Sequence, residues 1–207
     1  MPRHSTRPRS APERQIPDAD ALPRDQRARR DAIVAAAVAR IATTDYADIS
    51  VKQVAEEAGV ALGTLYRYFS SKDHLMACAL LAWASRFDEG IERESAVPRS
   101  ARLAAIYRRA ARAFEREPRV HDTLLQLQAS RDPHAMAAFT RFAERQLASF
   151  ESALGDAPET TRADVTMIMS AVLSESLRSC QSGSCSRAEV YRRIDRAAEL
   201  VTAGVDG

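Results

Sequence analysis

The chain has 207 residues, of which 45% are hydrophobic and 28% charged, a balance typical of a globular protein with a buried core. A net charge of +2 does not by itself indicate a nucleic-acid partner. The three cysteines form no disulfide framework, and no signal-peptide core or membrane-length apolar run is present. We therefore expect a cytoplasmic protein of one or two domains, with no membrane partner.

The first segment, residues 1–23, is rich in proline and arginine and has no apolar period. This composition predicts a disordered basic arm. Such an arm is either a solvent-exposed tail or a segment that contacts DNA phosphate or the minor groove.

Apolar positions recur at helical spacing from Arg24 onward, and no strand pattern is convincing. We predict an all-α fold of about nine helices. The first helix ends before residues 43–50, and two short helices follow, "VKQVAEEAG" capped by Ser50 and a second over 61–69. The remaining helices are expected from Ser70 or Ser71, from Pro98 to before Pro118, over about 119–130, from Pro133 to near Gly155, from Pro158 to about Ser182, and from Ser186 to about Ala203.

Residues 50–69 have the pattern of a helix-turn-helix, because two short helices flank a turn that contains Gly59. In this motif the N-terminal part of the second helix enters the major groove. Leu62, Leu65 and Phe69 share its inner face, which leaves Thr64 free to contact bases. Tyrosine hydroxyls beside it suit phosphate contacts.

Lys72 supports the same interpretation. It stands in the first turn of the next helix, where the helix dipole disfavours a cation. A phosphate bound there would be held by the ammonium group and by free backbone N–H groups.

The segment "SVKQVAEEAGVALGTLYRYFSSKDHLMACAL", residues 50–80, closely resembles the TetR family of bacterial transcriptional regulators. The resemblance implies a DNA-binding domain over about 24–80 and a larger helical domain over 81–207 that binds a ligand and dimerises. It also implies operator contacts at Thr64, Tyr66, Tyr68 and Lys72. The full set of candidate DNA-binding residues is Ser50, Lys52, Ala61, Leu62, Gly63, Thr64, Tyr66, Arg67, Tyr68 and Lys72.

Large apolar residues concentrate in the middle helices of 81–207. Each one alone is ordinary core, but together they predict an apolar cavity between helices. The candidate effector-binding residues are Tyr107, Phe114, Leu124, Leu127, Met136, Phe139, Phe142 and Met167. "GTLYRYFSSKDHL", "REPRVHDTL" and "VYRRIDRAAELV" are more loosely similar to regulators of sterol catabolism in that family, which implies a lipid or sterol-derived effector such as an acyl-CoA.

The last two helices carry narrow apolar seams with steps of three and four residues. Two such helices from each of two chains would form a four-helix bundle, and the homodimer would read an operator with inverted-repeat symmetry. The alternative is that the seams pack within one chain. The candidate interface residues are Val165, Met169, Val172, Val190, Ile194, Ala197 and Val201.

The sequence has no metalloprotease, phosphate-loop or nucleophile motif, so we expect no enzyme activity, no cofactor and no metal. His121 and His134 are expected at the surface or as caps. The main hypothesis is a repressor that leaves double-stranded DNA when a small apolar effector binds. Two alternatives stay open: a regulator that responds to a protein partner or to oxidation of Cys180 and Cys185, and a helical ligand-binding protein without operator function.

Overall fold

The computed structural model describes residues 16–19, 21–87 and 97–203. These residues form nine α-helices and two short 3-10 turns, without a strand, so the all-α prediction is confirmed. The elements are α1 (Arg24–Thr43), η1 (Tyr46–Asp48), α2 (Val51–Glu57), α3 (Leu62–Tyr68), α4 (Lys72–Ala84), η2 (Ser85–Phe87), α5 (Arg99–Arg116), α6 (Pro118–Leu127), α7 (Pro133–Leu154), α8 (Glu159–Gln181) and α9 (Arg187–Ala203). None of the described helices combines the length and the apolar character that a membrane span requires.

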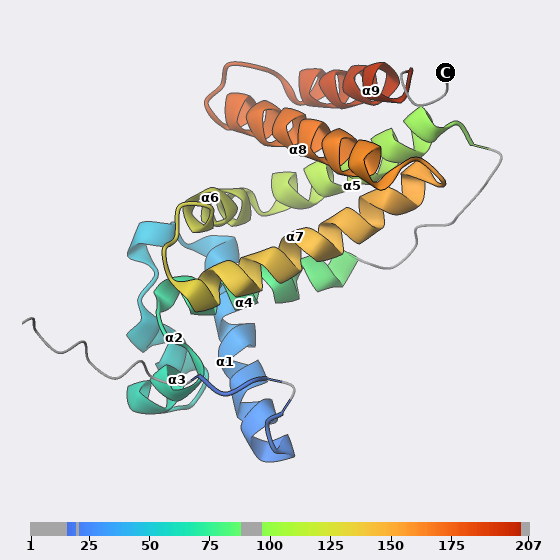
Figure 1. Ribbon diagram of the computed structural model, residues 1–207. Helices are drawn as coiled ribbons and strands as arrows, with labels where there is room; N and C mark the ends of the chain where they lie inside the picture. Colours follow the sequence, from blue (N-terminus) through green and yellow to red (C-terminus); the bar gives the residue numbers. More distant parts are fainter. Residues whose placement is uncertain (1–15, 20, 88–96, 204–207) are drawn as a thin grey trace, which may run out of the picture.

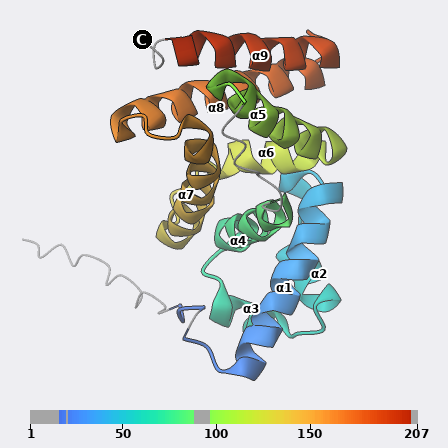
Figure 2. The same cartoon turned by 90° about the vertical axis from the view of Figure 1, so that its right-hand side faces the viewer.

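The helices fall into two groups joined by α4 (Figures 1 and 2). The head consists of α1 to α3, residues 24–68, and the body consists of α5 to α9, residues 99–203. In the body, α8 and α9 lie farthest from the head, and α6 and the start of α7 lie nearest to it. The helix α4 packs against α1 on one side and against α6 and α7 on the other.

The head is built around α1, whose apolar period gives one buried face. Ile33, Ala37 and Ile41 are fully buried at the four-residue spacing that places side chains on one side of a helix. This face packs against α2 and α4. The N-terminal residues of α1 lie at the same end of the molecule as α2 and α3 (Figure 1).

The turn between α2 and α3 is fixed at both ends by local hydrogen bonds. The Ser50 hydroxyl accepts from the Gln53 N–H and caps α2. At the other end, the Val60 N–H donates to Ala55 O at 2.9 Å and Gly59 adopts φ +67°, the left-handed conformation of a helix-ending glycine. The helix-turn-helix geometry therefore follows from residues that the sequence places at these positions.

The end of the predicted disordered arm is ordered. Residues 1–15 and 20 lie outside the described residues. Leu22 is 7% exposed and belongs to the hydrophobic core, and the Ala21 N–H donates to Asp18 O at 3.2 Å. The boundary predicted at residue 23 is therefore corrected, because burial of Leu22 attaches the chain to the head before α1 begins.

The helix α4 is buried on more than one face. Leu75, Ala79 and Trp83 are buried at four-residue spacing, and His74, Cys78 and Leu80 are buried as well. The reason is that α1, α6 and α7 surround the helix. The chain leaves the α-helix after Ala84 and forms a 3-10 turn.

The predicted subunit seams belong mainly to the core of one chain. Val165, Met169, Val190 and Ile194 are each at most 4% exposed. They are buried because α9 packs against α5 and α8 within the chain. This agrees with the alternative interpretation, in which the seams pack within one chain. Their assignment to a subunit interface is therefore corrected. Of the other predicted interface residues, Val172, Ala197 and Val201 are half-buried.

This burial generates a prediction for Ile194. Ile194→Asp should lower the free energy of unfolding of the chain itself by about 3–5 kcal/mol, because it places an unpaired carboxylate in the apolar core. Urea denaturation followed by circular dichroism measures the change. Ala188→Asp on the same helix is the control, since Ala188 is exposed. Equal stability of the Ile194 variant and the control would contradict the packing described here.

Candidate DNA-binding surface and effector cavity

The first turns of α2 and α3 form a solvent-facing surface at the end of the head. Lys52, Ala61, Gly63 and Arg67 are exposed, and Thr64 is half-buried. A side chain at Gly63 would meet nothing within 4 Å, so the chain itself does not block an approach to this turn. The surface therefore offers a close backbone approach, one hydroxyl and two cations to an extended partner.

Two residues of α3 lie differently from the prediction. Tyr68 is 4% exposed and follows Leu65, three residues earlier, into the core of the head, so it is not available to a partner in this conformation. Leu62 was placed both on the inner face and among the DNA-facing residues; it is 38% exposed, so it does not belong to the core. Tyr66 is half-buried and packs against the core.

Lys72 already has partners within the chain. Its ammonium donates to Tyr46 O, lies 3.4 Å from Ala47 O, and sits 4.6 Å from the centroid of the Tyr46 ring. Burial lowers the pKa of Lys72. The carbonyl groups of η1 therefore compensate the cation at the start of α4, and the prediction that a phosphate is needed for this is corrected.

Further cations, which the sequence analysis did not single out, lie at the end of the molecule that carries α2 and α3. Arg24 and Arg29 are exposed on the first turns of α1, and Gln53 is exposed beside Lys52 on α2. In the sequence these arginines are indistinguishable from a general excess, since all but two of the 30 basic residues are arginine. The first turns of α1 lie at the same end of the molecule as α2 and α3 (Figure 1), and this location distinguishes these two arginines from the others.

The body contains a cavity of about 620 Å³ between α5, α6, α7 and α8, with the end of α4 contributing to its wall. Six of the eight predicted residues line it: Tyr107, Phe114, Leu124, Phe139, Phe142 and Met167. Leu127 does not line it and is buried in the core, and Met136 is 55% exposed, one turn before the part of α7 that faces the cavity. The cavity that these six residues line is mainly apolar, and its volume is in the range of small-molecule binding sites.

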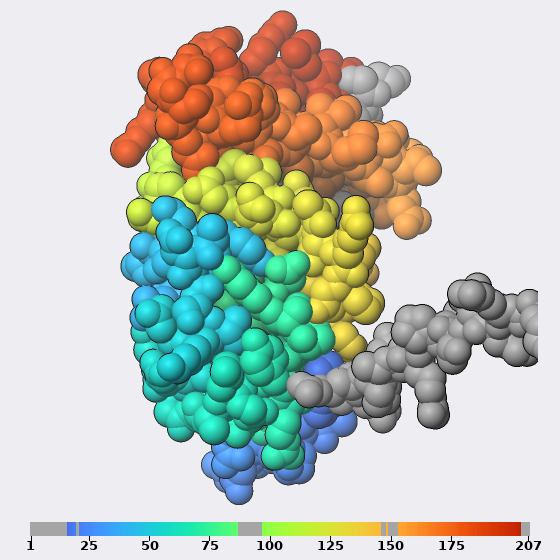
Figure 3. Space-filling view, turned by 90° about the vertical axis from the view of Figure 1, so that its left-hand side faces the viewer, coloured from blue at the N-terminus to red at the C-terminus, as the bar shows by residue number. Residues whose placement is uncertain are grey.

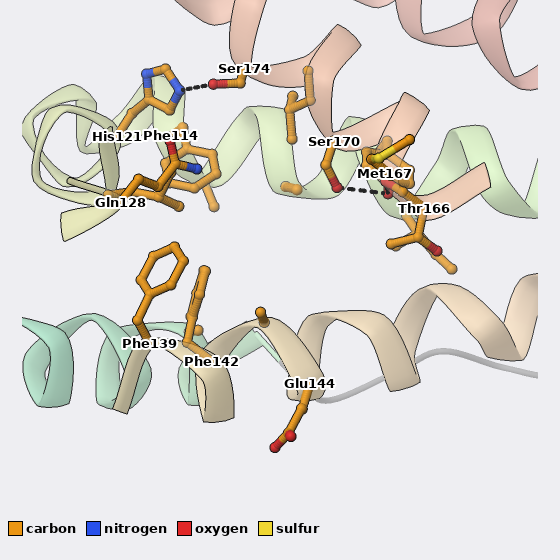
Figure 4. Close-up of a pocket in the computed structure, with 18 of the residues that line it drawn as sticks. Phe114, His121, Gln128, Phe139, Phe142, Glu144, Thr166, Met167, Ser170 and Ser174 are labelled. Atoms are coloured by element: carbon orange, nitrogen blue, oxygen red, sulfur yellow. Dashed lines mark hydrogen bonds between the residues drawn. The ribbon is translucent and has the colours of Figure 1, made fainter. Parts of the chain in front are cut away.

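The cavity also has polar groups that sequence reasoning missed. His121 is 1% exposed and lines the cavity, so its predicted surface or capping role is corrected. Its Nε2 lies 3.2 Å from Ser174 Oγ (Figure 4). Burial lowers the pKa of His121 below its ordinary value near 6.5, which keeps the imidazole neutral at pH 7.

Trp83 connects the cavity to the helix that leaves the head. The indole lines the cavity, its centroid lies 5.1 Å from that of Phe114, and its Nε1–H donates to Glu117 Oε2 at 2.9 Å. The same helix contributes Leu75 and Ala79 to the core near α1. The cavity wall is thus connected through α4 to α1 of the head.

A second connection lies at the start of α4. The Ser70 hydroxyl donates to Asp132 Oδ2 at 2.7 Å, and the Ser130 hydroxyl donates to Asp73 Oδ2 at 2.6 Å. The His74 ring stacks on the His134 ring of α7 with centroids 5.4 Å apart. Figure 3 shows the same junction on the surface, where the start of α7 (yellow) lies against α4 (green).

Comparison with known proteins finds a family match in the head and the start of α4. Residues 33–78, which include α2, α3 and their turn, match the family model described as bacterial regulatory proteins, tetR family. This segment of the chain is of the TetR type.

Curated relatives are similar to most of the chain. It is 28% identical over 179 residues to the HTH-type transcriptional repressor KstR of Mycolicibacterium smegmatis, covering 85% of this chain and 88% of the relative.

Two solved structures share the fold. A TetR transcriptional regulator from Rhodococcus sp. RHA1 superposes with a TM-score of 0.74 at 22% identity, covering 88% of this chain and 99% of that one. FadR from Bacillus subtilis, solved in complex with stearoyl-CoA, superposes with a TM-score of 0.62 at 18% identity, covering 84% and 98%.

The junction between α4 and α7 should make the stability of the protein depend on pH. Burial, and next the neighbouring His134, lower the pKa of His74 to about 4. An unfolded histidine takes up a proton near pH 6.5, so between about pH 6.5 and 4 the unfolded state binds more protons than the folded state. The free energy of unfolding should therefore fall as pH falls through this window, by at most about 3 kcal/mol.

His74→Asn tests this dependence, because its amide oxygen can still accept the Ser70 N–H that His74 Nδ1 accepts at 3.2 Å. Urea denaturation at pH 7 and at pH 4.5 should show a smaller loss on acidification for the variant than for the unmutated protein. The other charged groups around His74, Asp132, Arg30 and Arg141, are the same in both proteins. Identical losses in the two proteins would contradict the assignment to His74.

Proposed function

We propose that this protein is a transcriptional repressor that binds an operator through the exposed surface of α2 and α3 and leaves it when an apolar effector fills the cavity. The observation that carries the proposal is that a single helix, α4, packs in the head and supplies Trp83 to the cavity wall. The family match and the repressor relatives support the DNA-binding part. We propose no enzymatic activity.

The operator-facing residues in this proposal are those that the fold leaves accessible. They are Lys52, Ala61, Leu62, Gly63, Thr64 and Arg67, joined by Arg24, Arg29 and Gln53. Ser50 contributes as the cap that positions α2. Two copies reading two half-sites would require an operator with inverted-repeat symmetry.

A homodimer remains part of the proposal, with a different face from the predicted seams. Ile168 on α8 and Leu200 on α9 are 43% and 59% exposed. Large exposed apolar side chains on two adjacent helices are typical of an interaction surface. With the half-buried Val172, Ala197 and Val201 they would form the four-helix contact between two chains.

The effector in this proposal is an elongated, mainly apolar molecule, and the cavity between α5 and α8 is its site. Apolar and aromatic side chains dominate the lining. The stearoyl-CoA bound to FadR, which shares the fold, supports a lipid or sterol-derived thioester. Such a molecule can release DNA only by binding more tightly to a conformer whose two reading surfaces do not match the operator.

Regulation by oxidation has less support. Burial, followed by the nearby Cys185, raises the pKa of Cys180. A raised pKa lowers the fraction of thiolate, which is the form that oxidants attack. Cys180 therefore lacks the low pKa of redox-sensing cysteines.

The DNA-binding part predicts a change in salt dependence. Arg67→Ala should weaken binding to the promoter nearest the protein's own gene and reduce the slope of log K against log salt by about one unit, the effect of losing one phosphate contact. Fluorescence anisotropy at several salt concentrations measures both. Arg196→Ala is the control, since Arg196 is exposed on α9, far from the head, and pairs with Glu199 at 3.0 Å. A slope unchanged in the Arg67 variant would exclude this contact.

The effector part predicts two linked signals. Long-chain acyl-CoA or steroid thioesters should change Trp83 emission and lower operator affinity over the same concentration range, since Trp83 is the only tryptophan and lies in the cavity wall. Phe142→Asp should abolish both effects and leave operator binding intact.

Ala143→Phe provides a second variant without a buried charge, because Ala143 lines the cavity and a larger side chain would fill part of it. Met136→Asp is the control, at an exposed position on the same helix. Release of the operator by a small cationic compound, with no response to any apolar thioester, would show that the aromatic residues are only core.

A further inference from the structure

The carboxylate of Asp73 connects a turn of the head to a loop of the body. Asp73 stands in the first turn of α4, where the helix dipole favours a negative charge. Its Oδ1 accepts a hydrogen bond from the Tyr46 hydroxyl of η1, and its Oδ2 accepts one from the Ser130 hydroxyl at 2.6 Å. Tyr46 precedes the helix-turn-helix, and Ser130 lies between α6 and α7. One side chain therefore holds both parts of the molecule at the same time.

The body side of this bridge is attached to the end of α6. The Ser130 N–H donates to Leu127 O at 3.1 Å, and the Ser130 hydroxyl oxygen accepts from the Asp132 N–H at 3.4 Å. Leu124 of α6 lines the cavity, as does Gln128 just beyond the helix. A displacement of α6 at the cavity would therefore also displace the Ser130 hydroxyl.

The head side of the bridge is attached to the start of α2. Burial, and next the hydrogen bond to Asp73, raise the pKa of Tyr46, so its hydroxyl keeps its proton and remains a donor at pH 7. Lys72, the neighbour of Asp73, donates to Tyr46 O, so α4 holds Tyr46 at its backbone and at its hydroxyl. The buried Ile49 donates its N–H to Tyr46 O at 3.4 Å, and Ser50 then caps α2. The position of η1 therefore sets where α2 begins.

An ion pair joins the same two parts at the surface. Arg119 Nε of α6 lies 2.9 Å from Asp45 Oδ1, one residue before η1. These two side chains are 47% and 65% exposed, and exposed ion pairs contribute little to stability. The half-buried bridge at Asp73 is therefore the stronger of the two connections between η1 and the body.

We propose that Asp73 is a positioning residue for the helix-turn-helix, through which the loop between α6 and α7 sets the place of η1 and of the start of α2. In this bridge the Ser130 hydroxyl acts on η1 through the carboxylate. Removal of the Tyr46 hydroxyl should therefore also remove the influence of Ser130. This inference rests on the proposed function, since it names a contact through which the cavity acts on the DNA-binding surface.

The test is hydrogen exchange of the backbone amides of residues 46–57, measured by mass spectrometry on the full chain without DNA or effector. Ser130→Ala should speed this exchange about tenfold, the effect of losing one hydrogen bond to a charged group. In the background of Tyr46→Phe, the same Ser130→Ala substitution should change the exchange rate by less than about twofold, because the bridge is already broken. Two independent contacts would instead give the same factor in both backgrounds.

Ser70→Ala is the matched control. The Ser70 hydroxyl donates to Asp132 Oδ2 at 2.7 Å, so it makes the same kind of hydrogen bond across the same junction without using Asp73 or Tyr46. This substitution should leave the exchange of residues 46–57 unchanged. Thermal unfolding followed by circular dichroism verifies that each variant is folded.

Three results of the exchange experiment would overturn the inference: no effect of Ser130→Ala, the same factor in both backgrounds, or an equal effect of Ser70→Ala. A fourth comes from the operator. Palmitoyl-CoA should lower the operator affinity of the Ser130→Ala variant by a smaller factor than that of the unmutated protein, and equal factors would also overturn it. If the exchange responds as expected but no apolar thioester releases the operator, the bridge is confirmed and the effector part of the proposed function fails instead.

Discussion

The enclosure of α4 by the head and the body is the constraint on which the rest of the structure depends. Residues 75–80 and Trp83 are buried, and the helix packs against α1 on one side and against α6 and α7 on the other. Protein interiors are packed closely enough that such a helix cannot shift without its neighbours shifting too. A movement of α4 would therefore also move α1 and, with it, the exposed surface of α2 and α3.

The body holds this helix at both of its ends. At the start, Ser70 and Asp73 are hydrogen-bonded to the loop before α7, and at the end Trp83 is hydrogen-bonded to Glu117 between α5 and α6. The hydrogen bonds at the two ends fix the direction of α4, whereas apolar packing against α1, α6 and α7 fixes its distance from these helices. Under the proposed function, a displacement of the cavity wall would move α4 as a rigid body, which is the kind of change that switching proteins use.

Local chemistry explains which features could be predicted from the sequence. Ser50, Gly59 and the prolines that begin α6 to α8 locate helix ends, because caps and φ restrictions act within a few residues. The concentration of large apolar residues in the middle helices also identified six of the residues that line the cavity. Helical period could not identify which neighbour covers a face: the seam at Ile194 meets α5 and α8 of its own chain rather than a second copy, and Tyr68 turns into the head. The partners of Lys72 come from a turn 25 residues away, which no spacing rule connects.

The sharing of α4 has a thermodynamic consequence for the operator itself. Under the proposed function, the effector lowers the affinity for DNA by some factor. Bound DNA must then lower the affinity for the effector by the same factor, because the coupling free energy between two sites is the same in both directions. DNA then acts as an antagonist of the effector. A protein bound at its operator would respond only at higher effector concentrations than the free protein in the same cell, so the threshold of induction would depend on how many operator copies the cell contains.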